Sequence, residues 1–221
     1  MSRFTAKSRQ LFNYAHSLSA PDFYSPAEDT YLFLDTLESH IDSIVSLSVA
    51  PLVLEIGPGS GVISAFCTRA LTERGCVPRM IGLDVNLAAL KATTETFKCV
   101  DRTMFFDGLL CDGTTCALRG RVFDLIMCNP PYVPSDRNEF DHPLTAAWAG
   151  GLPDGREVTD QVIIRSSELL TSNGILLLLL DQRNDPSAVV SFAERFGLKG
   201  LLLAKKKVPG ELLYVYQFTR I

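Results

Sequence analysis

The residues best suited to chemistry in this sequence are Asn129, Pro130, Pro131 and Tyr132, which follow the apolar run 122–128. That run is typical of a buried strand, and proline, which lacks an N–H, favours extended backbone at the residue before it. The Asn129 side-chain oxygen and the Pro130 carbonyl could therefore accept hydrogen bonds from one planar amino group, beside the Tyr132 ring. Carboxamides and nucleobases carry such a group. A proline-rich loop that only caps a strand would contain the same residues.

A glycine-rich turn upstream favours a particular kind of cofactor. The apolar run 52–56 leads into Gly57, Gly59 and Gly61, and apolar residues then recur at helical spacing. Glycines let the backbone turn sharply and approach a ligand closely. The turn lacks the G-x-G-x-x-G spacing of dinucleotide-binding folds. Glu55 is unfavourable beside a pyrophosphate but suits a cationic ammonium group, which favours S-adenosylmethionine over NAD.

Acidic residues follow the next two expected strands. Asp84 ends the run 79–84, where a carboxylate in a doubly wound sheet accepts hydrogen bonds from ribose hydroxyls. Asp112 comes after the run 103–107, and an acid there could bond to an adenine amino group. Either acid alone is more often a simple strand-end cap. The order of all these strand ends favours a nucleoside-containing ligand.

The hydrophobic pattern predicts the elements that would position these side chains. Short apolar runs alternate with amphipathic stretches, which predicts an α/β domain with a mostly parallel sheet and helices on both faces. We expect strands near residues 52–56, 79–84, 103–107, 122–128, 174–180, 198–203 and 212–218, the last two as an antiparallel hairpin. We expect helices near residues 61–73, 87–97 and 155–171. In such sheets, ligands bind beyond the carboxyl ends of the strands.

Local signals suggest where some elements begin and end. The letters S-P-A-E from Ser25 form a capping-box pattern, which predicts a helix with Ser25 as its N-cap. Asn173 and Gly174 are typical of a helix end and would close the third predicted helix. The unbroken leucines 176–180 predict a strand buried on both faces.

Composition places the chain among single-domain proteins with a substantial core. It has 221 residues, 47% of them hydrophobic, and a formal net charge of −4. We expect an N-terminal extension of poor periodicity and high flexibility, residues 1–23, followed by one domain, residues 24–221. Residues 205–207 are the only run of lysines, so nucleic acid is not expected as a substrate. The apolar stretch 175–180 is too short to span a bilayer, so no membrane association is expected.

The cysteines and histidines do not form a recognisable metal or base site. The six cysteines lack a C-x-x-C pair and have no histidine at metal-ligand spacing, so we expect no metal. We interpret them as reduced, which indicates a cytoplasmic location and allows a nuclear one. The histidines are His16, His40 and His142. His142 lies nearest the N-P-P-Y residues, but a loop histidine is more often simply solvated.

Two further segments make the pattern more specific. Residues 24–32 read Y-x-P-A-E-D-T-x-L, and residues 146–157 read A-A-W-A-G-G-x-x-x-G-R-E. Together with N-P-P-Y, they resemble the eukaryotic and archaeal release-factor glutamine methyltransferases, a HemK-like family. The resemblance runs from about residue 24 to the C-terminus. It implies a Rossmann-like class I S-adenosylmethionine-dependent methyltransferase fold, with a mostly parallel seven-stranded sheet and a C-terminal antiparallel hairpin.

The resemblance also implies roles for individual residues. S-adenosylmethionine would be bound by Thr30, Glu55, Gly57, Gly59, Asp84, Asp112, Gly113 and Asn129. The substrate would contact Asn129, Pro130, Pro131, Tyr132 and Trp148, of which Asn129, Pro130 and Tyr132 would be catalytic. Gly113 stands where the family more often has a side chain, so it would offer its backbone N–H.

The implied reaction is N5-methylation of the glutamine in the G-G-Q motif of the class 1 translation termination factor. The family's active eukaryotic members pair with a small zinc-containing activator subunit. The strand expected at 103–107 should lie at an edge of the sheet, where unpaired N–H and C=O groups favour pairing with another chain. We therefore expect the activator to dock near Met104–Phe106.

Three other functions fit part of the pattern. An N6-adenine nucleic-acid methyltransferase would use the same acceptors, but it would need a basic groove and a means of flipping the base. A protein lysine methyltransferase would share the cofactor without needing acceptors for a planar amide. A non-catalytic binding subunit would tolerate a degenerate motif, whereas residues 129–132 are intact.

Overall fold

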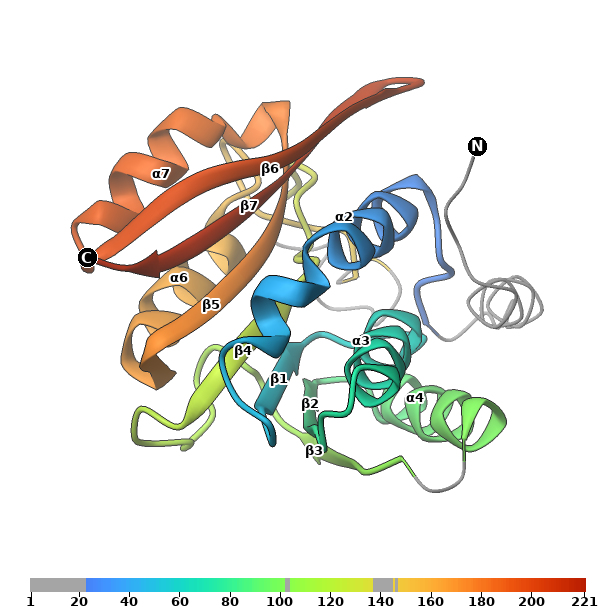
Figure 1. The fold of residues 1–221 in the computed structure, drawn as a ribbon. Coiled ribbons are helices and arrows are strands. Elements are labelled where there is room, and N and C mark those ends of the chain that lie inside the picture. The colour runs from blue at the N-terminus through green and yellow to red at the C-terminus, as the bar shows by residue number, and fades with distance from the viewer. Residues whose placement is uncertain (1–22, 102–103, 137–144, 146) are drawn as a thin grey trace.

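The computed structural model describes residues 23–101, 104–136, 145 and 147–221. They contain a seven-stranded sheet with the strand order β3-β2-β1-β4-β5-β7-β6 (Figure 1). Its strands are β1 (Leu52–Ile56), β2 (Arg79–Asp84), β3 (Phe106–Leu110), β4 (Phe123–Cys128), β5 (Leu170–Asp181), β6 (Leu198–Val208) and β7 (Glu211–Arg220). The pairs from β3 to β5 are parallel, and β7 is antiparallel to both of its neighbours. The expected sheet and its C-terminal hairpin are confirmed.

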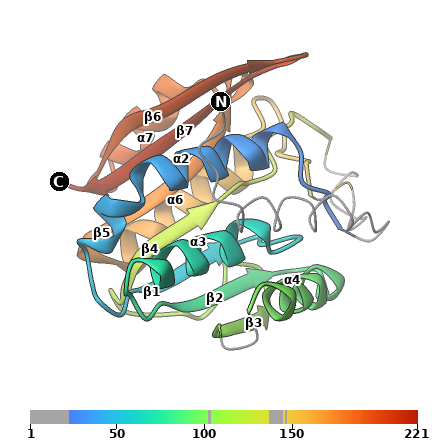
Figure 2. The same cartoon turned by 45° about the vertical axis from the view of Figure 1, so that its right-hand side comes forward.

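Helices cover both faces of the sheet, as expected (Figure 2). They are α2 (Glu28–Val45), α3 (Val62–Glu73), α4 (Leu87–Val100), α6 (Glu157–Leu169) and α7 (Pro186–Glu194), with a 3-10 turn, η2 (Gln182–Asn184). One apolar cluster joins α2 and α3 to the sheet, and a second joins α6 and α7 to its other face. The β5 leucines alternate between them: Leu177 and Leu179 lie in the first, Leu176 and Leu178 in the second. The prediction of a doubly buried strand is confirmed.

The first described helix begins later than its capping-box pattern predicted. Its N-cap is Ala27, which has extended backbone (φ −132°, ψ −165°), and the helix starts at Glu28 rather than after Ser25. Thr30 Oγ1 accepts the Ala27 N–H at 3.4 Å, and Asp29 Oδ1 accepts the Thr30 N–H at 2.6 Å. These side chains satisfy N–H groups that a Ser25 cap would not reach, so the prediction was wrong in position.

The junction between α6 and β5 corrects a second boundary. The helix ends at Leu169 and the strand begins at Leu170, so Asn173 and Gly174 lie inside β5 rather than at a helix end. The β4–β5 register shifts between Phe123 and Leu125, which marks an irregularity in the ladder. A Cβ at Gly174 would lie 2.8 Å from the Phe123 carbonyl oxygen. The glycine therefore permits close backbone approach at this irregularity, a role that also produces glycine in strands.

The strand β3 lies at an edge of the sheet, as expected, but further along the chain than the pattern predicted. It spans Phe106–Leu110, so Met104 and Phe105 precede it, and residue 103 of the expected strand lies outside the described residues. The half-buried Phe106 ring stacks on Phe97 with centroids 4.8 Å apart. Phe105 is 51% exposed. Of the expected N-terminal extension, only Phe23 is described.

Candidate active site

A cavity of about 830 Å³ opens at the carboxyl ends of β1, β2 and β4. The order of the strands reverses between β1 and β4, where open α/β sheets bind their ligands. All the predicted site residues line this cavity: Thr30, Glu55, Gly57, Gly59, Asp84, Asp112, Gly113, Asn129, Pro130, Pro131, Tyr132 and Trp148. The structure thus brings together residues that lie as far apart in the sequence as Thr30 and Trp148.

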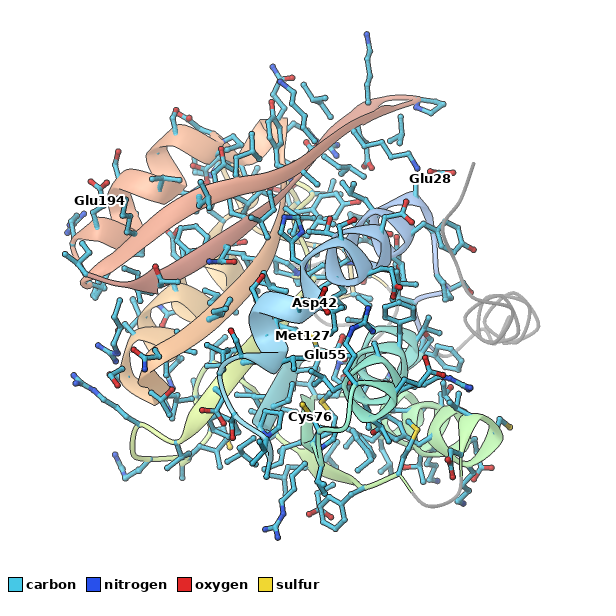
Figure 3. All side chains as sticks on the ribbon, in the orientation of Figure 1. Glu28, Asp42, Glu55, Cys76, Met127 and Glu194 are labelled. Atoms are coloured by element: carbon cyan, nitrogen blue, oxygen red, sulfur yellow. The ribbon has the colours of Figure 1, made fainter. Side chains whose placement is uncertain are left out.

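The glycine turn presents bare backbone to the cavity. Gly57 and Gly59 have φ angles of 72° and 55°, a region that favours glycine. No atom lies within 4 Å of where either Cβ would stand, so a ligand could approach the backbone here. Glu55 lies in the interior of the molecule, unlike the exposed Glu28 (Figure 3). Its carboxylate accepts a hydrogen bond from Ser64 Oγ.

The electrostatic state of these acids follows from their burial. Burial raises the pKa of Glu55 to about 8, and the Ser64 hydrogen bonds offset only part of this. Burial also raises the pKa of Asp84, although its carboxylate accepts backbone N–H groups from Asn86 at 2.8 Å and Gly59 at 3.3 Å. At Asp112, burial acts to raise the pKa, but hydrogen bonds from Thr114 and the next residue outweigh it and lower the value.

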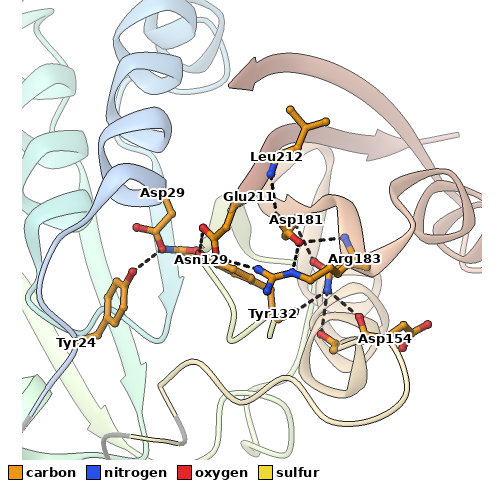
Figure 4. A network of polar contacts seen from close by, with 11 residues as sticks. Tyr24, Asp29, Asn129, Tyr132, Asp154, Asp181, Arg183, Glu211 and Leu212 are labelled. Atoms are coloured by element: carbon orange, nitrogen blue, oxygen red, sulfur yellow. Dashed lines mark hydrogen bonds and ion pairs between the residues drawn. The ribbon is translucent and has the colours of Figure 1, made fainter. Parts of the chain in front are cut away.

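Asn129 is held so that its amide oxygen remains available. Its Nδ2 donates to Asp29 Oδ2 at 2.9 Å (Figure 4). Its Oδ1 is buried and has no hydrogen-bond partner in the described part of the chain. Buried polar atoms without a partner are rare in native proteins, and such an atom in a cavity indicates a ligand contact. The Tyr24 hydroxyl donates to the same Asp29 oxygen at 3.0 Å.

Tyr132 is fixed at both ends by residues that follow β5. Its hydroxyl donates to Glu211 Oε2 at 3.2 Å, and its carbonyl oxygen accepts from Asn184 Nδ2 at 2.8 Å (Figure 4). The Arg183 guanidinium lies 6.0 Å from the ring centroid and pairs with Glu211 at 2.8 Å. Burial, together with nearby Asp29, raises the pKa of Tyr132, so its phenol remains a neutral donor.

The loop that carries Trp148 is fastened to the backbone beside Tyr132. Val133 N donates to the Trp148 carbonyl at 2.9 Å, and Gly150 N donates to the Val133 carbonyl at 2.8 Å. Asn184 Nδ2 also donates to the Asp154 carbonyl at 2.9 Å. This backbone pairing places Trp148 in the cavity wall, as expected.

The sequence patterns did not reveal the residues that support this arrangement. Asp29 lies within the P-A-E-D-T segment but had no assigned role, and Asn184 and Glu211 belong to no recognised motif. His142, the histidine nearest N-P-P-Y, lies outside the described residues. The described part of the chain has no helix with the length and hydrophobicity to span a bilayer, and it gathers no metal-binding group of His, Cys, Asp and Glu.

Comparisons with known proteins agree with this site. No protein-family model matches the chain. Methyltransferase HEMK2 of Homo sapiens is 34% identical over 203 residues, which cover 90% of this chain and 90% of that protein. A putative protein N5-glutamine methyltransferase of Methanocaldococcus jannaschii is 32% identical over 203 residues, covering 91% of this chain and 93% of its own. The chain belongs to the HEMK2 family of methyltransferases.

Solved structures support the same assignment. A chain of the E. cuniculi Mtq2–Trm112 complex, which is responsible for methylation of the eRF1 translation termination factor, superposes with a TM-score of 0.64. It is 26% identical, and the match covers 90% of this chain and 99% of that chain. As a member of the HEMK2 family, the chain is a methyltransferase that uses S-adenosylmethionine, and its fold is that of the class I enzymes.

The cavity has the chemistry that this cofactor of the HEMK2 family requires. Glu55 is a buried acid that accepts a hydrogen bond from the Ser64 side chain and keeps further acceptor capacity for an ammonium group. Asp84 is a strand-end acid beside the open glycine turn, which suits ribose hydroxyls. A Cβ at Gly113 would lie 2.6 Å from Ile56 Cγ2, so close packing explains the glycine after Asp112. The residues therefore fit S-adenosylmethionine.

Proposed function

We propose that this methyltransferase modifies the N5 amide nitrogen of the glutamine in the G-G-Q motif of the class 1 translation termination factor. The observation that supports this proposal most strongly is the buried, unpartnered Oδ1 of Asn129 at the cavity wall. The Pro130 carbonyl lies in the same wall, so two acceptors are available for the two N–H bonds of one carboxamide. The related M. jannaschii and E. cuniculi proteins are named for the same chemistry.

The chain's own residues address the low reactivity of an amide nitrogen, whose lone pair is delocalised into the carbonyl. Asn129 Oδ1 and the Pro130 carbonyl accept the two N–H bonds and increase electron density on the nitrogen. They also fix its direction of attack, which can supply a large part of the rate enhancement. S-adenosylmethionine, when bound, supplies the electrophilic methyl group. The product amide loses its extra proton afterwards, so no general base is needed before transfer.

The remaining predicted residues complete this assignment. Tyr132, held by Glu211 and Asn184, stacks against the amide plane, and Trp148 forms the wall of the substrate side. On the cofactor side, Glu55 binds the methionine ammonium and Asp84 the ribose hydroxyls. Thr30, Gly57, Gly59, Asp112 and Gly113 surround the rest of the cofactor. Because its substrate acts in translation, we place the protein in the cytoplasm.

The substrate test uses the chain co-expressed with its activator, labelled cofactor and three acceptors. These are the termination factor, the same factor with its G-G-Q glutamine changed to alanine, and an adenine-containing oligonucleotide. We expect label only in the unmodified factor, on the glutamine side chain. Label in the oligonucleotide, or equal label in both factors, would replace the proposal with the adenine or lysine alternative.

We also propose that a small zinc-containing activator pairs with the edge strand β3. The E. cuniculi relative is a complex with Trm112. In this chain, the edge carries exposed apolar side chains: Phe105 is 51% exposed, Leu109 40% and Leu110 57%. Apolar, unprotected edge strands favour pairing with another chain. The proposed interface is therefore residues 105–110, wider than the expected Met104–Phe106.

Substitution of this edge tests the partner. Phe105→Lys should fold normally but no longer co-purify with the activator, because the charge would be buried in the interface. Phe106→Lys should instead unfold the chain, since that ring stacks on Phe97. Val49→Lys, at a residue that is 81% exposed and outside the edge, is the matched control. Normal co-purification of both Phe105→Lys and Leu110→Lys would place the interface elsewhere.

A further inference from the structure

Asp29 lies between α2 and the N-P-P-Y residues, in contact with the side chain of Asn129. It belongs to the first turn of α2 and is 3% exposed. Its Oδ2 accepts from Asn129 Nδ2 at 2.9 Å, across 100 positions of sequence. Figure 4 shows the two side chains facing each other, with the Tyr24 hydroxyl on the far side of the carboxylate.

The two ends of an asparagine amide have nearly the same shape but opposite hydrogen-bonding character. Which end faces a cavity therefore depends on what the other end meets. A carboxylate accepts hydrogen bonds and cannot donate them, so Asp29 can pair only with the NH2 end of Asn129. The oxygen end, Oδ1, is then turned away from Asp29, where it is buried without a partner among the described residues.

Asp29 is itself held so that it cannot change this polarity. Oδ1 accepts from the Thr30 backbone N–H at 2.6 Å and from Thr30 Oγ1 at 3.2 Å. Oδ2 accepts from Tyr24 as well as from Asn129. Both carboxylate oxygens therefore face donors. An asparagine at position 29 would have one acceptor oxygen, so its NH2 would have to face a donor on one side.

We propose that Asp29 is a positioning residue that sets the amide of Asn129 with its oxygen toward the substrate. The proposal rests on glutamine methylation as the reaction, and it explains why an acid lies beside the acceptor site without touching the cofactor or the reacting nitrogen. It also makes Asp29 a determinant of specificity. With Asn129 reversed, the site would offer a donor where the substrate amide presents its own N–H.

Asp29→Asn in the complex with the activator tests this role. The backbone N–H of Thr30 cannot turn away, so the oxygen of the introduced amide should face it, and the introduced NH2 should face Asn129. We expect kcat to fall on the order of 100-fold, the range for losing one preorganised hydrogen-bonding group in an active site. The calorimetric Kd for S-adenosylmethionine should stay close to that of the unaltered chain. Asp35→Asn, the same change on the exposed side of α2, should leave kcat unchanged.

The exchange of the two residues separates polarity from a merely structural role. In the double variant Asp29→Asn, Asn129→Asp, the introduced NH2 at position 29 would donate to the introduced carboxylate at position 129. The second oxygen of that carboxylate would still accept from the substrate. We expect the double variant to be at least about tenfold faster than either single variant, since coupled residues are strongly non-additive. Full kcat in Asp29→Asn, or a double variant no faster than the singles, would overturn the proposal.

A substrate-independent measurement distinguishes this inference from the proposed function. The side-chain NH2 of Asn129, assigned by NMR through its loss in Asn129→Ala, should be shifted and protected from exchange by its bond to Asp29. It should lose that protection in Asp29→Asn and keep it in Asp35→Asn. An unprotected NH2 in the unaltered chain would overturn the inference. If the NH2 is protected but the termination factor is not methylated, the inference stands and the substrate proposal fails.

Discussion

The cofactor half and the substrate half of the cavity are built in different ways. In the cofactor half, each candidate contact lies at the end of its own strand: Glu55 in β1, Asp84 at the end of β2 and the glycine turn directly after β1. In the substrate half, Asn129 and Tyr132 follow β4, but distant residues fix them. Asp29 contacts Asn129 across 100 positions, and Glu211 contacts Tyr132 across 79.

This difference separates what binds from what orients. A strand end and a tight turn can hold a ligand because the local backbone already places the polar groups. An acceptor that must point in one direction needs further support, because a side-chain amide can turn about its last bond. Here α2 and the segment from β5 to β7 supply that support. We therefore expect changes in the substrate half to reduce turnover and changes in the cofactor half to weaken cofactor binding.

The largest effect should come from Asn129→Ala. The variant loses the acceptor that directs the amide nitrogen, so we expect turnover to fall by about 1000-fold or more. The fold should remain intact, and the Kd for S-adenosylmethionine should rise at most moderately. Kinetics with the termination factor and calorimetry with the cofactor provide the two values. A variant that keeps most of its turnover would show that the amide is not held by this residue.

The corresponding change in the cofactor half is Asp84→Ala. It removes an acceptor for the ribose hydroxyls and leaves the N–H groups of Gly59 and Asn86 without their partner. We expect cofactor binding to weaken by about 1–3 kcal/mol, the usual cost of lost hydrogen bonds to a charged group. Turnover at saturating cofactor should change much less. Undiminished affinity in calorimetry would remove Asp84 from the cofactor site.

The same contrast explains which features could be predicted from the sequence. The parallel strands, the glycine turn and the acids after them all have local signals, because hydrophobic period and turn residues determine them. The helix α7 also has one, since Asp185 and Pro186 are its N-cap and N1 residues, yet no helix is predicted there. Asp29, Asn184 and Glu211 could not be assigned roles, because only the folded chain brings them to N-P-P-Y. The Asn173–Gly174 pair shows that one local signal can serve either a helix end or a strand irregularity.

A smaller effect is expected for Asn184→Ala, which acts through the backbone of the substrate half. Asn184 is fully buried, and its Nδ2 serves the carbonyls of Tyr132 and Asp154. Their loss should cost about 1–3 kcal/mol in the free energy of unfolding. We expect kcat/KM for the termination factor to fall about tenfold as Tyr132 loses its fixed position. Denaturant unfolding and kinetics on one preparation give both quantities.

The neighbouring residue provides a control for this prediction. Asp185 caps α7 through a hydrogen bond from Ala188 N at 3.2 Å and contacts no residue of the N-P-P-Y segment in the described structure. Asp185→Ala should cost about 1 kcal/mol of stability, the typical value for a lost N-cap. Its kcat/KM should stay unchanged. If the two variants lost activity in proportion to stability alone, Asn184 would have no separate role in positioning Tyr132.

The smallest effect concerns the pH dependence of cofactor affinity, which depends on Glu55. Its pKa of about 8 means that the carboxyl is mostly protonated in the free chain near neutral pH. An ammonium group is bound best by the ionised form, so binding should release a proton. Affinity should therefore rise with pH, by at most about tenfold per unit, up to about pH 8. At higher pH, the cofactor's own amino group begins to lose its proton, because α-amino groups titrate near about pH 8.

The same shift has a consequence for folding whose sign can be checked independently. The folded chain keeps the Glu55 proton up to about pH 8, whereas the unfolded chain loses it near 4.5. Between these values the folded state binds more protons, so stability should fall as pH rises. Glu55→Gln has no proton to lose, so it should remove both the pH dependence of affinity and this part of the pH dependence of stability. Calorimetry in buffers of different ionisation enthalpy would detect the released proton. Affinity that is flat from about pH 6 to 8 in the unaltered chain would mean that Glu55 is already ionised there, and the acid in the cofactor half would then be preformed for binding.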